Sequence, residues 1–329
     1  MRFLSLLIIL IATASLSIAQ DIHLTQYYTN NQLLNPAYTG NYTGDYKAII
    51  NYRSQWAQVN SAIKTSVFSI EKNLTKFNKG FAAGLIVNKD YVSSYHLNTN
   101  RFYLSGSYTT EIKQNIIRVG LQAGGLYRSI NYSEQTFPDQ WDYNSGNFDK
   151  SIESGEPNTN NTKAFADVNA GIAYIRKFGN KKISAGYSAF HINRPKYGFI
   201  NNDERLAMRH VGNAALTFYM KNGFSVVPNF LYMRSAKATD FIIATNAYKK
   251  INSELILMLG AGFRGSTNSD AFLAIFGFQY KRFEFGFSTD FNVSELSKET
   301  KNKNAFEFSL TYTTPSRFGS KATIPCDRY

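Results

Sequence analysis

Residues that could perform catalysis are few and scattered along this chain. The sequence has no P-loop, no G-x-S-x-G elbow, no H-E-x-x-H zinc motif and no C-x-x-C pair. Ser188 and His191 stand close enough in sequence to act as nucleophile and base of a hydrolase. The simpler alternative is that Ser188 faces an interior and His191 caps a strand. We therefore predict that the protein is not an enzyme and needs no cofactor or metal.

An acidic segment, residues 129–162, is the second feature with possible chemistry. Its carboxylates are Glu134, Asp139, Asp142, Asp149, Glu153 and Glu156. The stretch Asp142-Tyr143-Asn144-Ser145-Gly146 could contribute to a calcium loop, but it lacks the full twelve-residue EF-hand pattern. A solvated, exposed loop is the simpler interpretation. We treat it as a candidate surface for a partner.

The N-terminus has the layout of a secretory signal. Arg2 supplies a positive start, 3–12 is a short apolar core, and Ser17-Ile18-Ala19 has small residues where a signal peptidase reads the chain. We expect cleavage after Ala19. The chain has one cysteine, Cys326, so no intrachain disulfide can form. An exported protein of this kind must be stabilised by its core or its membrane.

The formal net charge is +13. A basic balance can indicate nucleic-acid binding, but an exported protein rarely meets nucleic acid. An anionic membrane surface or an acidic partner is therefore the better explanation. We predict contact with outer-membrane lipid and exclude nucleic acid as a partner.

The elements that position these residues are strands with strict alternation. Near the C-terminus Phe283, Phe285 and Phe287 fall on one face, and Glu284 and Ser288 fall on the other. A period of two sustained over about ten residues is typical of a strand. After the signal there is no run of apolar residues long enough for a membrane-spanning helix. About fourteen such segments are expected, starting near Asp45, Ala62, Lys79, Asn98, Ile116, Lys163, Lys181, Ala207, Gly223, Ala238, Asn252, Asn268, Arg282 and Asn304.

Two features favour a transmembrane barrel over a soluble sandwich. The segments run for about 10 to 13 residues, whereas soluble strands usually have about 5 or 6 and membrane strands need about 9 to 11. Tight, lysine-rich turns alternate with longer loops, as in outer-membrane barrels. The longer loops are 89–97, 129–162, 192–206 and 292–303. We predict an all-β protein, a transmembrane antiparallel up-and-down β-barrel of about 14 strands in the cell outer membrane.

This prediction divides the chain into four parts. They are a signal peptide at 1–19, an N-terminal periplasmic or lumenal segment at 20–44, the barrel at 45–313 and a periplasmic C-terminal tail at 314–329. An even strand number places both termini on the short-turn, periplasmic side. The basic turns are then expected to face periplasmic partners.

Ordered motifs near the N-terminus resemble the opening of the PorP/SprF family of the Bacteroidetes type IX secretion system. They are Gln26-Tyr27, then Leu34-Asn35-Pro36-Ala37-Tyr38-Thr39-Gly40, then Tyr52-Arg53-Ser54-Gln55-Trp56. Segments 167–174 and 186–191 are also similar to that family, and the tail resembles its cysteine-containing end, with Asp327 where a proline is expected. The candidate partner or lumen contacts are Asn35, Pro36, Ala37, Tyr38, Gly40, Tyr52, Arg53, Gln55 and Trp56.

The resemblance implies an accessory barrel that supports export or cell-surface anchoring of a large, secreted surface adhesin, in some members linked to gliding motility. It also implies partners among the periplasmic peptidoglycan-associated and ring components of the secretion system. No catalytic residue carries over. The alternative is a small-solute porin or a hydrophobic-compound transporter, with Arg118, Arg264 and Glu284 lining its channel.

Overall fold

The computed structural model describes residues 23–56, 62–74, 80–131, 135–155, 162–198, 203–266, 270–293 and 304–316. The expected signal peptide, Cys326 and most of the expected tail lie outside these residues. Cleavage after Ala19 therefore stays a prediction.

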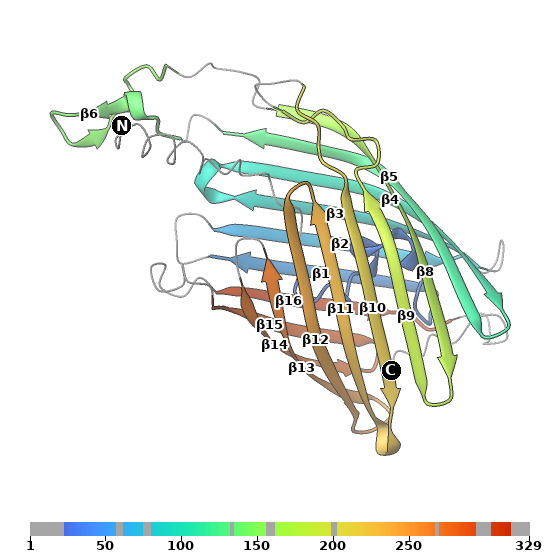
Figure 1. Ribbon diagram of the computed structural model, residues 1–329. Coiled ribbons are helices and arrows are strands. Elements are labelled where there is room, and N and C mark those ends of the chain that lie inside the picture. The colour runs from blue at the N-terminus through green and yellow to red at the C-terminus, as the bar shows by residue number, and fades with distance from the viewer. Residues whose placement is uncertain are drawn as a thin grey trace, which may run out of the picture.

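Fourteen antiparallel strands of the described chain close into a single barrel (Figure 1). They are β1 (Tyr46–Gln55), β2 (Ile63–Asn73), β3 (Phe81–Val92), β4 (Leu97–Ile112), β5 (Asn115–Ile130), β8 (Thr162–Phe178), β9 (Lys181–Phe190), β10 (Arg209–Tyr219), β11 (Phe224–Ser235), β12 (Ala238–Lys250), β13 (Leu255–Ser266), β14 (Ala271–Tyr280), β15 (Phe283–Asn292) and β16 (Ala305–Thr313). β1 pairs with β16 as well as with β2, so the sheet leaves no open edge. The predicted antiparallel barrel is confirmed.

The two ends of the barrel differ in their connections. At one end, called the loop end here, lie the connections 131–161, 191–208 and 293–304. At the other, the turn end, 113–114, 179–180 and 281–282 join neighbouring strands tightly. The start of β1 and the end of β16 meet at the turn end, where the amide of Thr314 donates to the carbonyl of Tyr46 (2.9 Å).

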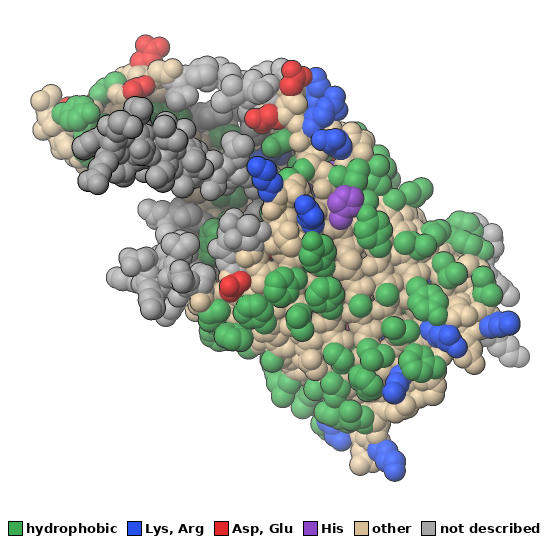
Figure 2. All heavy atoms as spheres, viewed as in Figure 1, with side chains coloured by type: hydrophobic (Ala, Val, Ile, Leu, Met, Phe, Trp, Pro, Cys, Tyr) green, Lys and Arg blue, Asp and Glu red, His purple; other side chains and the backbone are tan. Residues whose placement is uncertain are grey.

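The wall is apolar outside and polar inside. Outward Phe102, Leu104 and Phe272 keep 54%, 69% and 56% of their surface exposed. Inward Asp167 and Glu307 are fully buried. Figure 2 shows hydrophobic side chains over the middle of the outer wall and Lys and Arg toward its two ends. This distribution suits a lipid-embedded wall with polar rims. Among the described residues, no helix is long and apolar enough to cross a membrane.

Short elements complete the structure. The long connection between β5 and β8 holds the 3-10 turn η4 (Pro138–Gln140) and a two-stranded hairpin, β6 (Trp141–Asp142) with β7 (Asn147–Phe148), drawn apart from the barrel in Figure 1. Two further 3-10 turns are η2 (Ser93–Tyr95) and η5 (Lys221–Gly223). Before β1 come the one-turn helix α2 (Asn31–Leu34) and the 3-10 turn η1 (Pro36–Tyr38).

The Asn35-Pro36-Ala37-Tyr38 motif forms η1 for local reasons. The Asn35 side-chain oxygen accepts a hydrogen bond from the amide of Ala37 (2.9 Å), which caps the turn. Pro36 occupies the first position, where it has no amide hydrogen to leave unpaired. Gly40 follows with φ of +74°, a conformation that favours glycine. The motif therefore forms a compact, capped turn.

Candidate functional site

Residues 23–44, called the plug here, lie inside the barrel. At the loop end the His23 imidazole approaches the Asp240 carboxylate (Nδ1 to Oδ2, 3.5 Å). At the turn end the Tyr42 hydroxyl donates to the carbonyl of Glu71 (2.9 Å). The plug thus runs the length of the lumen. The start of β1 and the end of β16 meet at the turn end, whereas His23, the first described residue, lies at the loop end. The two termini of the chain lie outside the described residues.

Glycines on the inner wall make room for the plug. A Cβ atom on Gly120 would fall under 3.0 Å from the backbone of Pro36 and Ala37, and one on Gly171 would meet the Asn35 side chain as closely. Gly84, Gly186 and Gly286 make comparable room for Gln32, Tyr38 and Gln26. Glycine in a strand often marks a close approach of another backbone. The wall is therefore shaped for this particular segment.

Hydrogen bonds hold the plug against the same strands. The Asn35 amide donates to the carbonyls of Ile172 (3.0 Å) and Tyr187 (3.1 Å) on β8 and β9. The Arg118 guanidinium donates to the carbonyls of Ala37 (2.8 Å) and Thr39 (2.6 Å). The Arg118 bonds satisfy carbonyls of a segment that has little secondary structure of its own.

A buried charge cluster anchors the plug at the loop end. It consists of Arg53, Arg264, Asp290 and Glu307 around Thr25. Arg53 lies 2.7 Å from Asp290 and 3.4 Å from Glu307, and Arg264 lies 3.5 Å from Asp290. Two positive and two negative groups thus compensate one another away from water.

The plug completes this cluster through Thr25. Its hydroxyl donates to Asp290 (2.6 Å), and its amide donates to Glu307 (2.7 Å). The hydroxyl oxygen accepts bonds from Arg53 (2.7 Å) and Arg264 (2.9 Å). Removing Thr25 from the lumen would leave all four charges with unmet hydrogen bonds. The cluster is therefore a latch between plug and wall.

The residues of the two family motifs lie in different parts of the structure, one motif in the plug and the other at the end of β1. Asn35, Pro36, Ala37, Tyr38 and Gly40 form the middle and turn-end part of the plug. Within the second motif, only Arg53 belongs to the charge cluster.

The other residues of the second motif lie at the wall. Tyr52 faces outward with 36% of its surface exposed, and Gln55 ends β1. Trp56, with φ of +59°, donates its amide to the carbonyl of Asn304 (3.2 Å) at the loop end. The signature is therefore not one contact patch.

Ser188 and His191 each have a hydrogen-bond partner inside the barrel. The Ser188 hydroxyl donates to the plug carbonyl of Leu34 (2.7 Å). The His191 Nδ1 lies 2.9 Å from the Asp167 carboxylate, which also accepts from the Tyr103 hydroxyl (2.7 Å). The Ser188 bond joins the wall to the plug, and the Asp167 bonds join His191 to Tyr103 of β4.

The acidic loop carries its own small scaffold. Trp141 and Phe148 pack edge to face across the β6–β7 hairpin (4.9 Å), and Tyr143 at its tip is 90% exposed. Asp142 accepts from the amides of Asn144 and Ser145, and these bonds lower its pKa. The two bonds favour the ionised form of Asp142.

The remaining loop carboxylates do not converge. Asp149 accepts from Ser151, which lowers its pKa, while Asp139 and Glu153 are exposed. Glu134 and Glu156 lie outside the described residues. Within the described segments no group of three or more candidate metal ligands comes together. The calcium alternative gains no support from this arrangement.

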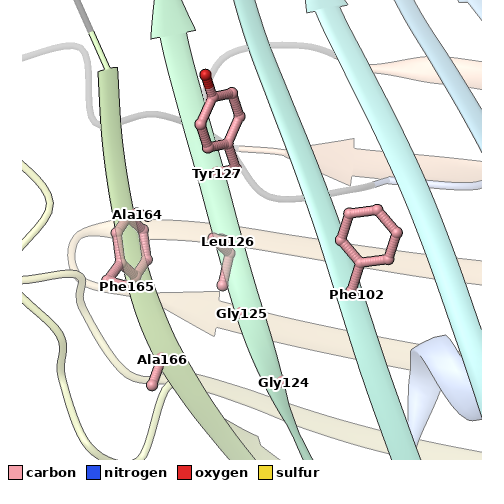
Figure 3. A pocket seen from close by; sticks show the side chains of 8 residues that line it. All are labelled: Phe102, Gly124, Gly125, Leu126, Tyr127, Ala164, Phe165 and Ala166. Carbon is pink, nitrogen blue, oxygen red and sulfur yellow. The ribbon is translucent and has the colours of Figure 1, made fainter.

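A shallow hollow lies in the outer wall over β4, β5 and β8. Its volume is about 510 Å³, and Phe102 and Tyr127 rise beside Gly124 and Gly125, which have no side chains to fill it (Figure 3). Its other lining residues, from β5 and β8, are Leu126, Ala164, Phe165 and Ala166. The lining is almost entirely apolar, so the hollow suits a hydrocarbon chain rather than polar chemistry.

A second cavity lies inside the barrel beside the plug. Its volume is about 240 Å³. It is lined by plug tyrosines and by inward residues from the turn-end halves of the strands, such as Lys47, Lys182 and Glu284. We call this space the vestibule. The strand residues that line this cavity lie toward the turn end.

A closed strand cylinder with an apolar outer wall and a polar lumen filled by its own chain is a plugged membrane β-barrel. Comparison with family models is consistent with this class. The model described as "Type IX secretion system membrane protein PorP/SprF" matches residues 16–312. The chain belongs to the PorP/SprF family, as the motif resemblance indicated. A search of curated proteins gives no match.

Solved structures with a similar fold include three transporters or channels. The chain is 8% identical to the Ralstonia pickettii toluene transporter TbuX (TM-score 0.50, covering 86% of this chain and 93% of that one). It is 11% identical to the P. putida toluene transporter TodX (0.51, 88% and 95%) and 8% identical to the CymD monoaromatic hydrocarbon channel (0.52, 88% and 93%). At these identities the likeness concerns the fold alone.

Proposed function

We propose that this protein is an outer-membrane accessory barrel of the type IX secretion system, which supports export or cell-surface anchoring of a large adhesin-type cargo. The observation that carries the proposal is the plug. The family's own motif residues hold a segment of chain against the inner wall, where an open pore would need free space. A barrel of this size is also too narrow to pass a folded protein.

In this proposal the two ends of the barrel have different partners. The loop end faces the cell exterior, and the acidic β6–β7 hairpin with exposed Tyr143 contacts the cargo. The turn end faces the periplasm, where lysines of the tight turns contact peptidoglycan-associated and ring components. Aromatic and charged groups on a small ordered hairpin suit recognition of another protein.

The test is deletion of the gene followed by mass spectrometry of the cell-surface proteome. We expect one or a few large surface proteins to disappear, and expression of the intact chain to restore them. An unchanged surface proteome would contradict the proposal. The hairpin is tested in the same strain, because a chain lacking 139–149 should insert normally and yet fail to restore the surface protein.

A second candidate function is transport of hydrophobic compounds. It is favoured by the apolar hollow at Phe102 and Tyr127. The latched plug weighs against it. Uptake of toluene into proteoliposomes that contain the purified barrel separates the two functions, since an accessory barrel should transport none above empty liposomes.

A further inference from the structure

The apolar hollow in the outer wall exists because two neighbouring strands carry small outward residues there. In one row of the register Phe102 of β4 stands beside Gly125 of β5, and Gly125 stands beside Ala166 of β8. The next row toward the loop end pairs Tyr127 with Ala164 (Figure 3). The volume of about 510 Å³ lies within the roughly 300–1,000 Å³ of ligand sites. An acyl chain suits such an apolar lining on a lipid-facing wall.

The hollow borders on polar outward residues at its loop-end side. Lys89 of β3 stands opposite Asn100 of β4, and Asn100 stands opposite Tyr127 of β5. Lys89 is exposed, and it has no ion pair with any residue in the described part of the chain. Tyrosine is typical of the boundary between hydrocarbon and headgroups. A lipid whose chain lies in the hollow would therefore place its headgroup near a cation.

A second cation lies on the other side of the hollow. The Asn193 side chain donates to the carbonyl of Ala166 (2.7 Å) and accepts from the amide of Val168 (3.2 Å). The next residue, Arg194, is exposed, and its guanidinium has no ion pair among the described residues. Arg194 lies beyond β8, which is three strand spacings, or roughly 14 Å, from the β3 backbone that carries Lys89. A headgroup with two separate phosphates suits cations so far apart better than a headgroup with one.

The backbone of β8 is open beside the hollow. β8 pairs with β9 only from Ala170 onward, so residues 162–169 have β5 as their one strand partner among the described residues. Val168 and Ala166 turn backbone groups toward Asn193 on the open side. By strand alternation Ala164 turns its N–H and C=O the same way, and no described residue bonds to them. Unpaired edge groups of this kind can bind the hydroxyls and phosphate oxygens of a sugar headgroup.

We propose that the hollow binds one phosphorylated glycolipid of the outer leaflet, of the lipid A type. One acyl chain lies beside Phe102 over Gly125, the phosphates contact Lys89 and Arg194, and the sugar contacts the open backbone at Ala164. The proposal rests on one part of the proposed function, namely that the loop end faces the cell exterior. It does not rest on the cargo or on the periplasmic partners.

The test measures lipid binding by the purified full-length barrel in detergent, with native mass spectrometry as the readout. The probes are diphosphoryl lipid A, monophosphoryl lipid A and phosphatidylglycerol, each titrated separately. We expect one bound molecule of diphosphoryl lipid A, with an affinity at least tenfold above that for phosphatidylglycerol, and an intermediate affinity for the monophosphoryl form. Equal affinities for diphosphoryl lipid A and phosphatidylglycerol, or no bound lipid A, would overturn the proposal.

A first variant fills the hollow without changing any charge. A Cβ atom on Gly125 meets only the carbonyl of Phe165, at 3.5 Å, so the wall can accept a side chain there. Gly125→Phe should weaken binding of diphosphoryl lipid A at least tenfold. The matched control is Gly212→Phe on β10, opposite the exposed Tyr187, where a Cβ has nothing within 4 Å. It should change the affinity less than threefold. Unchanged affinity in Gly125→Phe, with the heat-dependent gel shift of a folded barrel retained, would overturn the proposal.

A second variant removes the two cations. Lys89→Gln with Arg194→Gln should weaken binding of diphosphoryl lipid A at least tenfold. The matched control, Arg234→Gln with Lys237→Gln, changes two exposed basic residues at the same end, on β11 and in the turn after it. It should change the affinity less than threefold. An equal loss in both double variants would assign the binding to general attraction by the basic rim and overturn the proposal. The surface-proteome test of the deletion strain is independent of these measurements, so failure of the lipid site and failure of the proposed function are distinguishable.

Discussion

Arg53 is the one residue of the second motif that joins the plug to the wall. Its guanidinium touches Asp290, Glu307 and Thr25, which come from two strands and from the plug. A planar guanidinium with several donors suits such a junction better than an ammonium group does. The family motif therefore has a structural meaning at this position that its spacing alone does not reveal.

Removal of Arg53 should be strongly destabilising. Arg53→Ala leaves Asp290 and Glu307 buried with Arg264 as their remaining cation, and breaking a buried pair typically costs about 3–5 kcal/mol. Unfolding by urea in detergent micelles measures the loss. Arg234→Ala is the control, since Arg234 is an exposed residue of β11. A loss below about 1 kcal/mol for Arg53→Ala would show that the cluster is not a latch.

The inner-wall glycines allow a test of plug fit that leaves charge unchanged. Gly120→Leu should expel Pro36 and Ala37 from the wall, because even a Cβ there meets the plug backbone. Limited proteolysis should then cleave the plug faster than in the unmodified protein. Gly106→Leu on β4 is the control, since a Cβ there has nothing within 4 Å. Equal cleavage in both variants would contradict the fit.

At the scale of elements, the plug decides whether the barrel conducts. The intact protein should give no steady conductance in a planar bilayer, since the plug fills the lumen. Deletion of 23–40 removes most of the plug and keeps 41–44 before β1, and it should open a stable pore. If the intact barrel conducts as well as the deletion variant, the plug does not block ion flow. That result would favour the small-solute porin alternative.

Most of the strand architecture could be predicted from the sequence. The expected starts at Asp45, Lys181 and Asn252 lie within three residues of the observed Tyr46, Lys181 and Leu255, and the other strands agree as well. Alternation of apolar and polar residues involves only residues close together in the chain, so it can be read from the sequence alone. The antiparallel neighbours then follow from the short turns between them.

The contents of the lumen could not be predicted in the same way. Alternation says that Arg118 and Arg264 face inward, but not that they bind plug residues Ala37 and Thr25 in place of lining a channel. Those contacts join segments distant in sequence. One signal was present, namely inward glycines such as Gly120, where a wall residue normally carries a side chain. Such positions indicate a backbone lying against the wall.

The two ends of the barrel differ in charge and in structure, and this difference bears on the orientation of the barrel in the membrane. The loop end carries the acidic hairpin and the latched start of the plug. The turn end carries the lysine-rich turns and the vestibule. Basic residues near a rim also interact with anionic lipid, so charge alone does not distinguish the two sides of the membrane. Orientation is therefore a measurable property on which both proposals depend.

Cysteine labelling on intact cells determines the orientation. In a Cys326→Ser background, which removes the one native thiol, Tyr143→Cys marks the exposed hairpin tip and Lys250→Cys marks an exposed position at the turn end. A membrane-impermeant maleimide should label the hairpin variant on intact cells and the turn-end variant only after permeabilisation. The reverse labelling pattern would place the hairpin in the periplasm, and it would contradict the proposed contact between the hairpin and the cargo. Even with the reverse labelling pattern, the plug would still close the lumen. The latch at Arg53 and the fit at Gly120 do not depend on which way the barrel faces.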